Sequence, residues 1–366
     1  MGEKCTVIGL MSGTSIDGVD AALVVTDGET VFARGQFCHI EYPDDFRARL
    51  RESLERAAAA GEKIKDSFFE ALEKDLTEWH ARAVALVLEE NGKRAGDIDL
   101  IGFHGQTLFH APEQKFTWQL GNGAMLARMT GIDVVGDFRS HDMKHGGEGA
   151  PFLPLYHRAL FRDRAIDAPV AVLNIGGVSN VTWLFGDKIL AFDCGPGNAL
   201  MDDFVAKREG AAFDEGGKLA GQGTVNKTIL TAWINHPYFC AIPPKSLDRN
   251  DFKVEQLEAL STKDGLATLA AFTIEAISKS TNHFEAPPQT WLVTGGGRHN
   301  DYLMERLGKK LAADFTPIEE AGSNGDSIEA EGFAYLAVRS VRGLPLSVPG
   351  TTGIDKPRSG GNLFTH

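Results

Sequence analysis

The sequence of 366 residues is longer than a typical single hydrophobic core, which predicts two domains or one large two-lobed unit. Its formal net charge of −13 argues against binding nucleic acid irrespective of sequence, because that needs a basic stripe that we do not find. No run of about 18 apolar residues and no signal-peptide core is present, so we expect neither a membrane span nor secretion, and a cytoplasmic location. The 4 cysteines form no CxxC pair, which is typical of a reducing compartment and indicates no zinc site.

The predicted elements form an α/β pattern. Buried strands are expected at 7–11, 21–25, 31–42, 98–104, 133–138, 170–175, 181–185, 189–192 and 291–294. Helices are expected at 44–60, 66–91, 121–131, from Asn198, at 301–311 and at 327–342, with further helices between 224 and 284. The tail from Gly343 is rich in glycine and proline, which predicts irregular structure.

Each half of the chain begins with three strands and continues with helices, which indicates a weak internal duplication. The first two strands of the chain form a predicted β-hairpin. We place the N-terminal lobe at 1–168 and the C-terminal lobe at 169–366, with the last helix and the tail after about 343 as candidates to return to the first lobe.

Common single-motif enzymes find no support in the sequence. EGGKLAG (215–221) lacks the upstream glycine of a P-loop and has leucine after its lysine, and GQGTVN (221–226) lacks the last glycine of GxGxxG. GxSxG and HExxH are absent. A Rossmann dehydrogenase is therefore not expected.

Four glycine-rich turns each follow an apolar strand: GTSIDGVD (13–20), GGVSN (176–180), CGPGN (194–198) and GGGRHN (295–300). Such turns present backbone N–H groups at a sheet edge, where they suit phosphate. Thr14 and Ser15 add hydroxyl groups, and the carboxylates of Asp17 and Asp20 suit a hydrated divalent cation. One such turn is explained as well by ordinary hairpin chemistry, but four predict a nucleotide cleft between two lobes.

Asp193 is the candidate general base. It follows the strand at 189–192, and Gly195, Pro196 and Gly197 after it predict a turn, with Asn198 as the cap of the next helix. A carboxylate at a strand end that faces a cleft is suited to accepting a proton. The alternative is a turn aspartate that bonds its own backbone amides.

The segment DFRSHDMKHGGEGAP (137–151) concentrates Arg139, His141, Lys144 and His145 in an otherwise acidic protein. Flexible glycines follow these cations, so the segment is a candidate anion clamp on a mobile loop. A solvated surface loop is the alternative.

Polar residues at two other places suit a sugar. His104 and Gln106 in FHGQTLFH stand at the end of a strand, where they could hydrogen-bond a polyhydroxy ligand. Glu329 lies near the start of the last amphipathic helix, where it either faces the cleft or is an ordinary surface charge.

In the residues and the order of these motifs, the sequence resembles the anhydro-N-acetylmuramic acid kinases. The resemblance covers about Val7 to Gly353 and rests on LMSGTSIDGVDAAL, FHGQT, GDFRS…GGEGAP, LNIGGVSNVT, FDCGPGNALMD, VTGGGRHN and EAEGFAYLA. It implies a two-lobed actin-like ATPase fold, a duplicated ribonuclease H-like α/β architecture with an interdomain ATP cleft. Most members of the actin, hexokinase and heat-shock chaperone superfamily carry an aspartate where this chain has Met11 and Asn174, so the metal would shift to Asp17 or Asp20.

The resemblance implies that ATP phosphorylates O6 while water opens the 1,6-anhydro ring, giving N-acetylmuramic acid 6-phosphate and ADP in cell-wall recycling. Asp193 would activate the water, Glu329 would orient the sugar, and Arg139 or His145 would meet the lactyl carboxylate. ATP and Mg²⁺ would be held by Gly13, Thr14, Ser15, Ile16, Asp17, Gly18, Val19, Asp20, Gly176, Gly177, Asn180, Gly295, Gly296, Gly297 and Asn300. The sugar would meet His104, Gln106, Asp137, Arg139, His145, Gly197, Asn198 and Glu329.

Two other functions remain open at this point: a sugar kinase of the same fold in which Asp193 deprotonates an ordinary hydroxyl, and an actin-like or chaperone-like nucleotide-binding module. The polar residues that suit a sugar ligand favour an enzyme. The oligomeric state is not readable, and a homodimer is one option.

Overall fold

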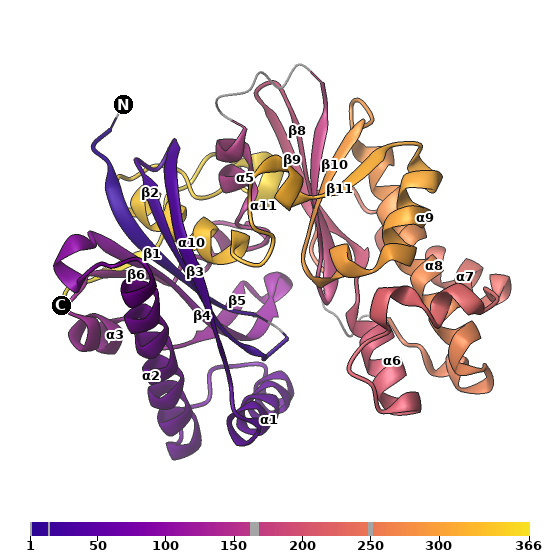
Figure 1. Ribbon diagram of the computed structural model, residues 1–366, viewed down its shortest axis with the longest axis horizontal. Coiled ribbons are helices and arrows are strands. Elements are labelled where there is room, and N and C mark those ends of the chain that lie inside the picture. The colour runs from indigo at the N-terminus through magenta and orange to yellow at the C-terminus, as the bar shows by residue number, and fades with distance from the viewer. Residues whose placement is uncertain (1, 14, 162–167, 248–251) are drawn as a thin grey trace. The chain divides into compact units, whose positions relative to one another are not determined.

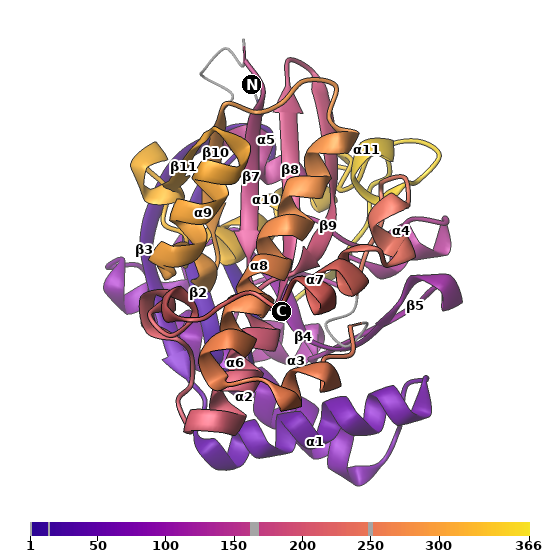
Figure 2. The same cartoon turned by 90° about the vertical axis from the view of Figure 1, so that its right-hand side faces the viewer.

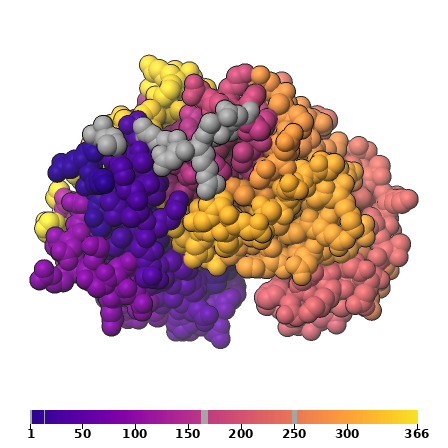
Figure 3. Space-filling model, turned by 45° about the horizontal axis from the view of Figure 1, so that its top comes forward, coloured from indigo at the N-terminus to yellow at the C-terminus, as the bar shows by residue number. Residues whose placement is uncertain are grey.

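The computed structural model describes residues 2–13, 15–161, 168–247 and 252–366. The chain divides into two compact units, which are described separately. The first comprises Met1–Asp163 and Asp326–His366, and the second comprises Arg164–Gly325. The return to the first unit comes before the last helix, so that helix and the tail both belong with the N-terminal residues. In Figure 3 yellow C-terminal residues accordingly lie among the indigo and purple of the N-terminal half.

The first unit is built on a seven-stranded sheet in the order β12-β6-β4-β1-β2-β3, with β5 beside β4 (Figure 1). β1, β2 and β3 are antiparallel, whereas β4 runs parallel to β1 and β6 parallel to β4. The strands are β1 (Cys5–Ser12), β2 (Gly18–Thr26), β3 (Val31–Glu41), β4 (Leu100–Ala111), β5 (Phe116–Leu120), β6 (Val134–Gly136) and β12 (Asn362–Phe364).

The second unit repeats this pattern in a five-stranded sheet, in the order β11-β10-β7-β8-β9. Three antiparallel strands again come first, and β10 then runs parallel to β7 and β11 parallel to β10. The strands are β7 (Val170–Ile175), β8 (Val178–Phe185), β9 (Lys188–Pro196), β10 (Thr290–Thr294) and β11 (Asp314–Pro317). The α/β class and the duplication predicted from the sequence are confirmed.

Helices cover both sheets. In the first unit these are α1 (Asp44–Ala60), α2 (Ser67–Glu90), α3 (Gly123–Thr130), α4 (Ser140–Lys144), α5 (Pro154–Leu160), α10 (Ile328–Val341) and α11 (Pro349–Thr352). In the second they are α6 (Ala199–Glu209), α7 (Lys227–Ile234), α8 (Thr262–Ser280) and α9 (Asp301–Leu311). Figure 2 shows α8 in front of β8 and β9, where its apolar face joins the core of that unit. Within the described residues no helix is long and apolar enough to cross a membrane.

The boundaries of α2 follow from its end residues. The side chain of Asp66 accepts a hydrogen bond from the N–H of Phe69 at 3.0 Å, which caps the first turn. Gly92, just beyond the last turn, has a φ of 59°, a left-handed conformation that favours glycine. Leu72, Leu76 and Val87 are fully buried, as the spacing of apolar residues predicts.

Several expectations about the elements were wrong. β4 continues to Ala111, so His104 and Gln106 lie within it and not at its end, and β5, β11, α4 and α5 were not expected. β9 continues to Pro196 instead of ending at residue 192, because its last residues still pair with β8 across a bulge. The tail is not wholly irregular: it forms α11, and β12 pairs with β6 and becomes the edge strand of the sheet. A strand of three residues depends on this long-range pairing and leaves little trace in local sequence.

Helix α10 lies directly on the backbone of the first sheet. A Cβ atom on Gly9 of β1 would lie 1.8 Å from the carbonyl oxygen of Ala330, and one on Gly102 of β4 would lie 2.1 Å from that of Phe333. No real Cβ fits at these distances, so both positions require glycine for close helix–sheet contact.

Gly9→Ala should therefore lower the free energy of unfolding by about 3 kcal/mol, because the helix must move away from the sheet. Gly96→Ala is the matched control, since a Cβ there meets nothing within 4 Å, and its effect should stay below about 0.5 kcal/mol. Urea unfolding of both variants measures the difference. Equal effects would contradict the packing argument.

Candidate active site

Two glycine turns of the second unit are bonded to each other. The N–H of Asn198 donates to the carbonyl oxygen of Gly176 at 2.6 Å, and that of Gly197 to the oxygen of Gly177 at 3.0 Å. A Cβ on Gly197 would lie 2.1 Å from the oxygen of Gly176. The absence of side chains thus lets GGVSN and CGPGN meet backbone to backbone.

The third turn of this unit, GGGRHN, joins them. A Cβ on Gly295 would lie 2.3 Å from Oδ1 of Asn174, and one on Gly297 equally close to Cγ2 of Ile175. Asn174 pairs with Thr294 at the ends of the parallel strands β7 and β10. The three turns therefore gather at one edge of the sheet, where amides of GGVSN and GGGRHN suit a phosphate chain and those of CGPGN bond to GGVSN.

Asn198, Arg298 and Asn300 fix these turns. The predicted cap Asn198 makes no side-chain capping bond, and its amide donates instead to the oxygen of Ile175 at 3.2 Å. Asn300 caps α9 by accepting from the N–H of Leu303 at 3.1 Å. Arg298, which the sequence analysis did not select, is buried and donates to the oxygen of Gly295 at 3.0 Å. The sequence signal that could have identified Arg298 is its position inside GGGRHN.

Asp193 is mostly buried and lies in β9, opposite Asn180 of β8. Its Oδ2 accepts a hydrogen bond from the N–H of Leu247 at 2.8 Å. Its own N–H donates to the oxygen of Lys245 at 3.0 Å, and its carbonyl oxygen accepts from the hydroxyl of Tyr238 at 2.6 Å. These bonds join Asp193 to a segment about fifty residues later, and not to its own turn.

Lys245 holds that segment together. Its Nζ donates to the carbonyl oxygen of Tyr238 at 2.8 Å and lies 4.5 Å from the centre of the Tyr238 ring. The ammonium group is also 5.7 Å from the centre of the Phe192 ring, a distance suited to a cation–π contact. Burial lowers the pKa of Lys245. The sequence analysis missed this residue, because a lysine after two prolines carries no local signal.

The hairpin turn of the first unit is closed by its own polar groups. The N–H of Ile16 donates to the oxygen of Gly13 at 3.2 Å, and Ile16 has a φ of 56°. The hydroxyl of Ser15 donates to Oδ1 of Asp17 at 2.7 Å, whereas Oδ1 of Asp20 is paired with Nδ1 of His39 at 2.7 Å. Thr14 lies outside the described residues.

Gly18 and Val19 contribute backbone to this turn. A Cβ on Gly18 would lie 2.2 Å from the oxygen of Ile40, and Val19 is fully buried in the core. Both residues thus hold β2 in register with β3. Any ligand contact from them would come from the main chain.

His104 and Gln106 are both committed to contacts within the first unit. The amide of Gln106 accepts from the hydroxyl of Ser12 at 2.6 Å and donates to the oxygen of Gly13 at 3.1 Å, so it braces the hairpin turn. Nδ1 of His104 lies 2.9 Å from the oxygen of Gly105, and Nε2 accepts from Nε of Arg139 at 3.1 Å. Nδ1 must therefore carry the proton. Burial, followed by the charge of Arg139, lowers the pKa of His104 well below its usual value.

Glu329 connects the hairpin turn with the predicted anion loop. Its side chain is partly exposed, yet desolvation raises its pKa to about 7. The charges of Asp20 and Asp17 raise the pKa further, while that of Arg139 lowers it. Charges from the hairpin turn and from the segment 137–151 thus both act on Glu329.

Asp137 and His145 are used in other ways. The carboxylate of Asp137 accepts bonds from Ser140 and, at 2.9 Å, from the amide of Asn362 in β12, so it fastens the tail. His145 is exposed, and its Nδ1 lies 2.7 Å from the oxygen of His141. Of the predicted clamp, Arg139 is the member whose charge acts on the pKa of Glu329.

The donor set fits a divalent cation of the Mg²⁺ type. Asp17 is exposed at the turn, and Asp20 carries a second carboxylate with one oxygen bound to His39. Within the described residues no group of three or more His, Cys, Asp or Glu is placed to hold an ion alone. Mg²⁺ is commonly held by one or two carboxylates together with substrate phosphates and water, so the two aspartates suffice.

Comparison with known proteins identifies similar chains. A family model described as anhydro-N-acetylmuramic acid kinase matches residues 5–366. A protein of that name from Rhizorhabdus wittichii is 46% identical over 360 residues, which is 98% of this chain and 98% of the relative. One from Acidiphilium cryptum is 48% identical over 360 residues, 97% of each chain. A ROK family glucokinase structure from Streptomyces griseus has a TM-score of 0.41 and 13% identity, covering 90% of this chain and 98% of the other.

Glu329→Gln should stabilise the protein at high pH. A carboxyl group whose pKa is raised by folding contributes stability below its unfolded pKa and loses it as pH rises through about 7. After allowance for partial exposure, the variant should gain about 1 to 2 kcal/mol relative to the wild type between about pH 4 and pH 8. Urea unfolding at the two pH values measures this gain. A difference that is constant with pH would contradict the shifted pKa.

Lys245→Met should loosen the segment that holds Asp193. Because the bond to Tyr238 is lost, the amide hydrogens of Asp193 and Leu247 should exchange with solvent at least about tenfold faster. Lys279→Met is the matched control, since Lys279 lines the same small cavity. Hydrogen exchange followed by mass spectrometry measures both. Equal exchange in the two variants would show that Lys245 does not hold the segment.

Proposed function

The chain belongs to the anhydro-N-acetylmuramic acid kinase family, and we infer from this membership the reaction that it catalyses. It is a phosphotransferase that uses ATP to phosphorylate O6 of 1,6-anhydro-N-acetylmuramic acid as water opens the anhydro ring. The products are N-acetylmuramic acid 6-phosphate and ADP, and the reaction serves peptidoglycan recycling. A cytoplasmic location suits a sugar kinase of this kind and stays part of the proposal.

We propose that Asp193 is the catalytic base. Its carboxylate would take a proton from a water molecule whose oxygen attacks C1. The C1–O6 bond then breaks, O6 takes the γ-phosphoryl group, and ADP leaves. A carboxylate is a weak base, but C1 acquires oxocarbenium character as the bond lengthens, so a weak base suffices. The observation that carries this role is the fixed orientation of Asp193 by Leu247, Lys245 and Tyr238.

The glycine turns would bind the phosphates of ATP. The turns at Gly176, Gly197 and Gly295 lie at one sheet edge; the N–H groups of GGVSN and GGGRHN would provide donors without a positive side chain, while those of Gly197 and Asn198 hold the turns together. Asp17 and Asp20 would hold Mg²⁺. When bound, the ion neutralises charge on the phosphates during transfer. The adenosine would lie against the turn at 295–300.

The first unit would recognise the muramic acid. Arg139 is the cation whose charge lowers the pKa of Glu329, and a guanidinium suits the lactyl carboxylate that distinguishes muramic acid from glucosamine. Glu329 would accept hydrogen bonds from sugar hydroxyl groups and so orient the ring. His104, held as an acceptor for Arg139, would keep that guanidinium in place.

Asp193→Asn should reduce turnover by at least about a thousandfold while ATP still binds, because the amide cannot accept the proton. Asp203→Asn is the matched control: Asp203 is exposed on α6, and its loss should leave turnover unchanged. ADP release with the anhydro sugar measures turnover, and calorimetry measures ATP binding. Loss of ATP binding in Asp193→Asn would contradict the role of base.

The same assay separates the alternatives. With 1,6-anhydro-N-acetylmuramic acid, ADP release should be fast, and it should be slow with N-acetylmuramic acid or no sugar. Preference for the open sugar would indicate an ordinary hydroxyl acceptor. Equal ADP release without sugar would indicate a nucleotide-driven module instead of a kinase.

A further inference from the structure

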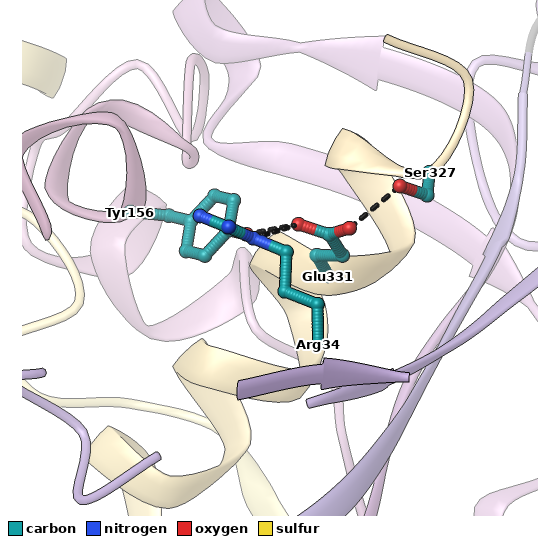
Figure 4. Close-up of polar contacts among 4 residues, drawn as sticks. All are labelled: Arg34, Tyr156, Ser327 and Glu331. Carbon is teal, nitrogen blue, oxygen red and sulfur yellow. Dashed lines mark hydrogen bonds and ion pairs between the residues drawn. The ribbon is translucent and has the colours of Figure 1, made fainter. Parts of the chain in front are cut away.

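A buried carboxylate, that of Glu331, follows the proposed sugar-binding residue Glu329 by two positions in α10. Glu331 of α10 has a side chain that is only 4% exposed, and three residues converge on it: Arg34 from β3, Tyr156 from α5 and Ser327 at the start of α10 (Figure 4). Nε of Arg34 donates to Oε2 at 3.1 Å, and the Tyr156 hydroxyl donates to the same oxygen. The hydroxyl of Ser327 donates to Oε1 at 2.6 Å.

These contacts fix the first turn of α10. The N–H of Glu331 donates to the backbone oxygen of Ser327 at 2.8 Å, and the side chains of the same two residues are bonded as well. The turn is thus closed twice. Residues four apart share one face of a helix. The side-chain bond between Ser327 and Glu331 therefore lies on the helix face that also contacts Arg34 and Tyr156.

Glu329 lies on the other side of that turn. Two residues along a helix correspond to about 200°, so Glu329 and Glu331 face nearly opposite directions. Glu329 is in the electrostatic field of Asp17, Asp20 and Arg139, whereas Glu331 is bound to α5 and β3. A rotation or fraying of the turn would therefore move Glu329 away from the residues beside it.

The hydroxyl of Ser327 closes this end of the helix through Glu331 and not through the helix backbone. Ser327 makes no capping hydrogen bond to the helix backbone, because its hydroxyl donates to Glu331. α10 is also held close to α5, where a Cβ on Gly332 would lie 2.2 Å from Cδ2 of Leu153. The position of the turn thus depends on the Glu331 contacts and on packing against α5.

We propose that Glu331 is a positioning residue that fixes the first turn of α10 and through it the orientation of Glu329 toward the sugar. A buried carboxylate is costly unless its oxygens are fully bonded, and here a cation, a phenol and a hydroxyl supply the donors. Glu331 does not touch the substrate. This inference rests on the sugar-binding role proposed for Glu329.

The test is a double-mutant cycle with Glu331→Gln, Glu329→Gln and the double variant. Each single change should raise the KM for the anhydro sugar about tenfold and leave the KM for ATP within about twofold. The double variant should be no worse than Glu329→Gln, because Glu331 acts through Glu329. Asp75→Asn, which breaks the Arg49–Asp75 ion pair in the same unit, is the control and should leave both KM values unchanged.

Independent effects that multiply to about a hundredfold in the double variant would overturn the inference. So would a lower kcat in Glu331→Gln with both KM values unchanged, since that indicates only a smaller folded fraction. A normal sugar KM in Glu329→Gln would overturn the sugar-binding role of Glu329 itself. In that case the pKa of Glu329 would still show whether Glu331 fixes the turn.

The carboxyl pKa of Glu329, followed by ¹³C NMR, reports on the turn without any substrate. In Glu331→Gln and in Ser327→Ala the pKa should fall from about 7 toward that of an exposed glutamate, because a loosened turn exposes the carboxylate. Ser327→Ala keeps the charge of Glu331, so it separates loosening from the loss of a charge. An unchanged pKa in both variants would overturn the inference.

Discussion

The structure of the first unit depends on the direct contact between helix α10 and the backbone of its sheet. Gly9 and Gly102 let the helix approach so closely that no other residue would fit at either position. This contact fixes the depth and direction of α10, and the bonds of Glu331 to Arg34, Tyr156 and Ser327 fix its first turn. Both contacts fix the turn that carries Glu329.

The second unit uses the same device at its sheet edge. Gly197 and Gly295 have no side chains, so three turns meet there backbone to backbone. Asp193 stands on the neighbouring strand and is held from outside by the segment that carries Tyr238 and Lys245. Backbone proximity thus organises the proposed phosphate site, and long-range hydrogen bonds organise the proposed base.

Local sequence was sufficient for the longer strands and helices, the duplication and the glycine turns, because periodicity and turn residues encode them. It missed the short elements β5, β11, β12, α4, α5 and α11. It failed at the end of β9, where Gly195 and Pro196 imitate a turn but still pair with β8. It also missed Lys245 and Glu331. Their partners lie far away in the sequence, Arg34 being 297 residues from Glu331, and no local pattern records such contacts. The family resemblance supplied the reaction, which periodicity and spacing alone did not reveal.

In the proposed reaction, the water activated by Asp193 supplies the oxygen at C1 while O6 carries the phosphate. Turnover in ¹⁸O-labelled water, stopped before the anomeric oxygen can exchange, tests this directly by mass spectrometry of the sugar phosphate. We expect one ¹⁸O atom at C1 and none in the phosphoryl group. Label in the phosphoryl group, or no label at C1, would contradict it.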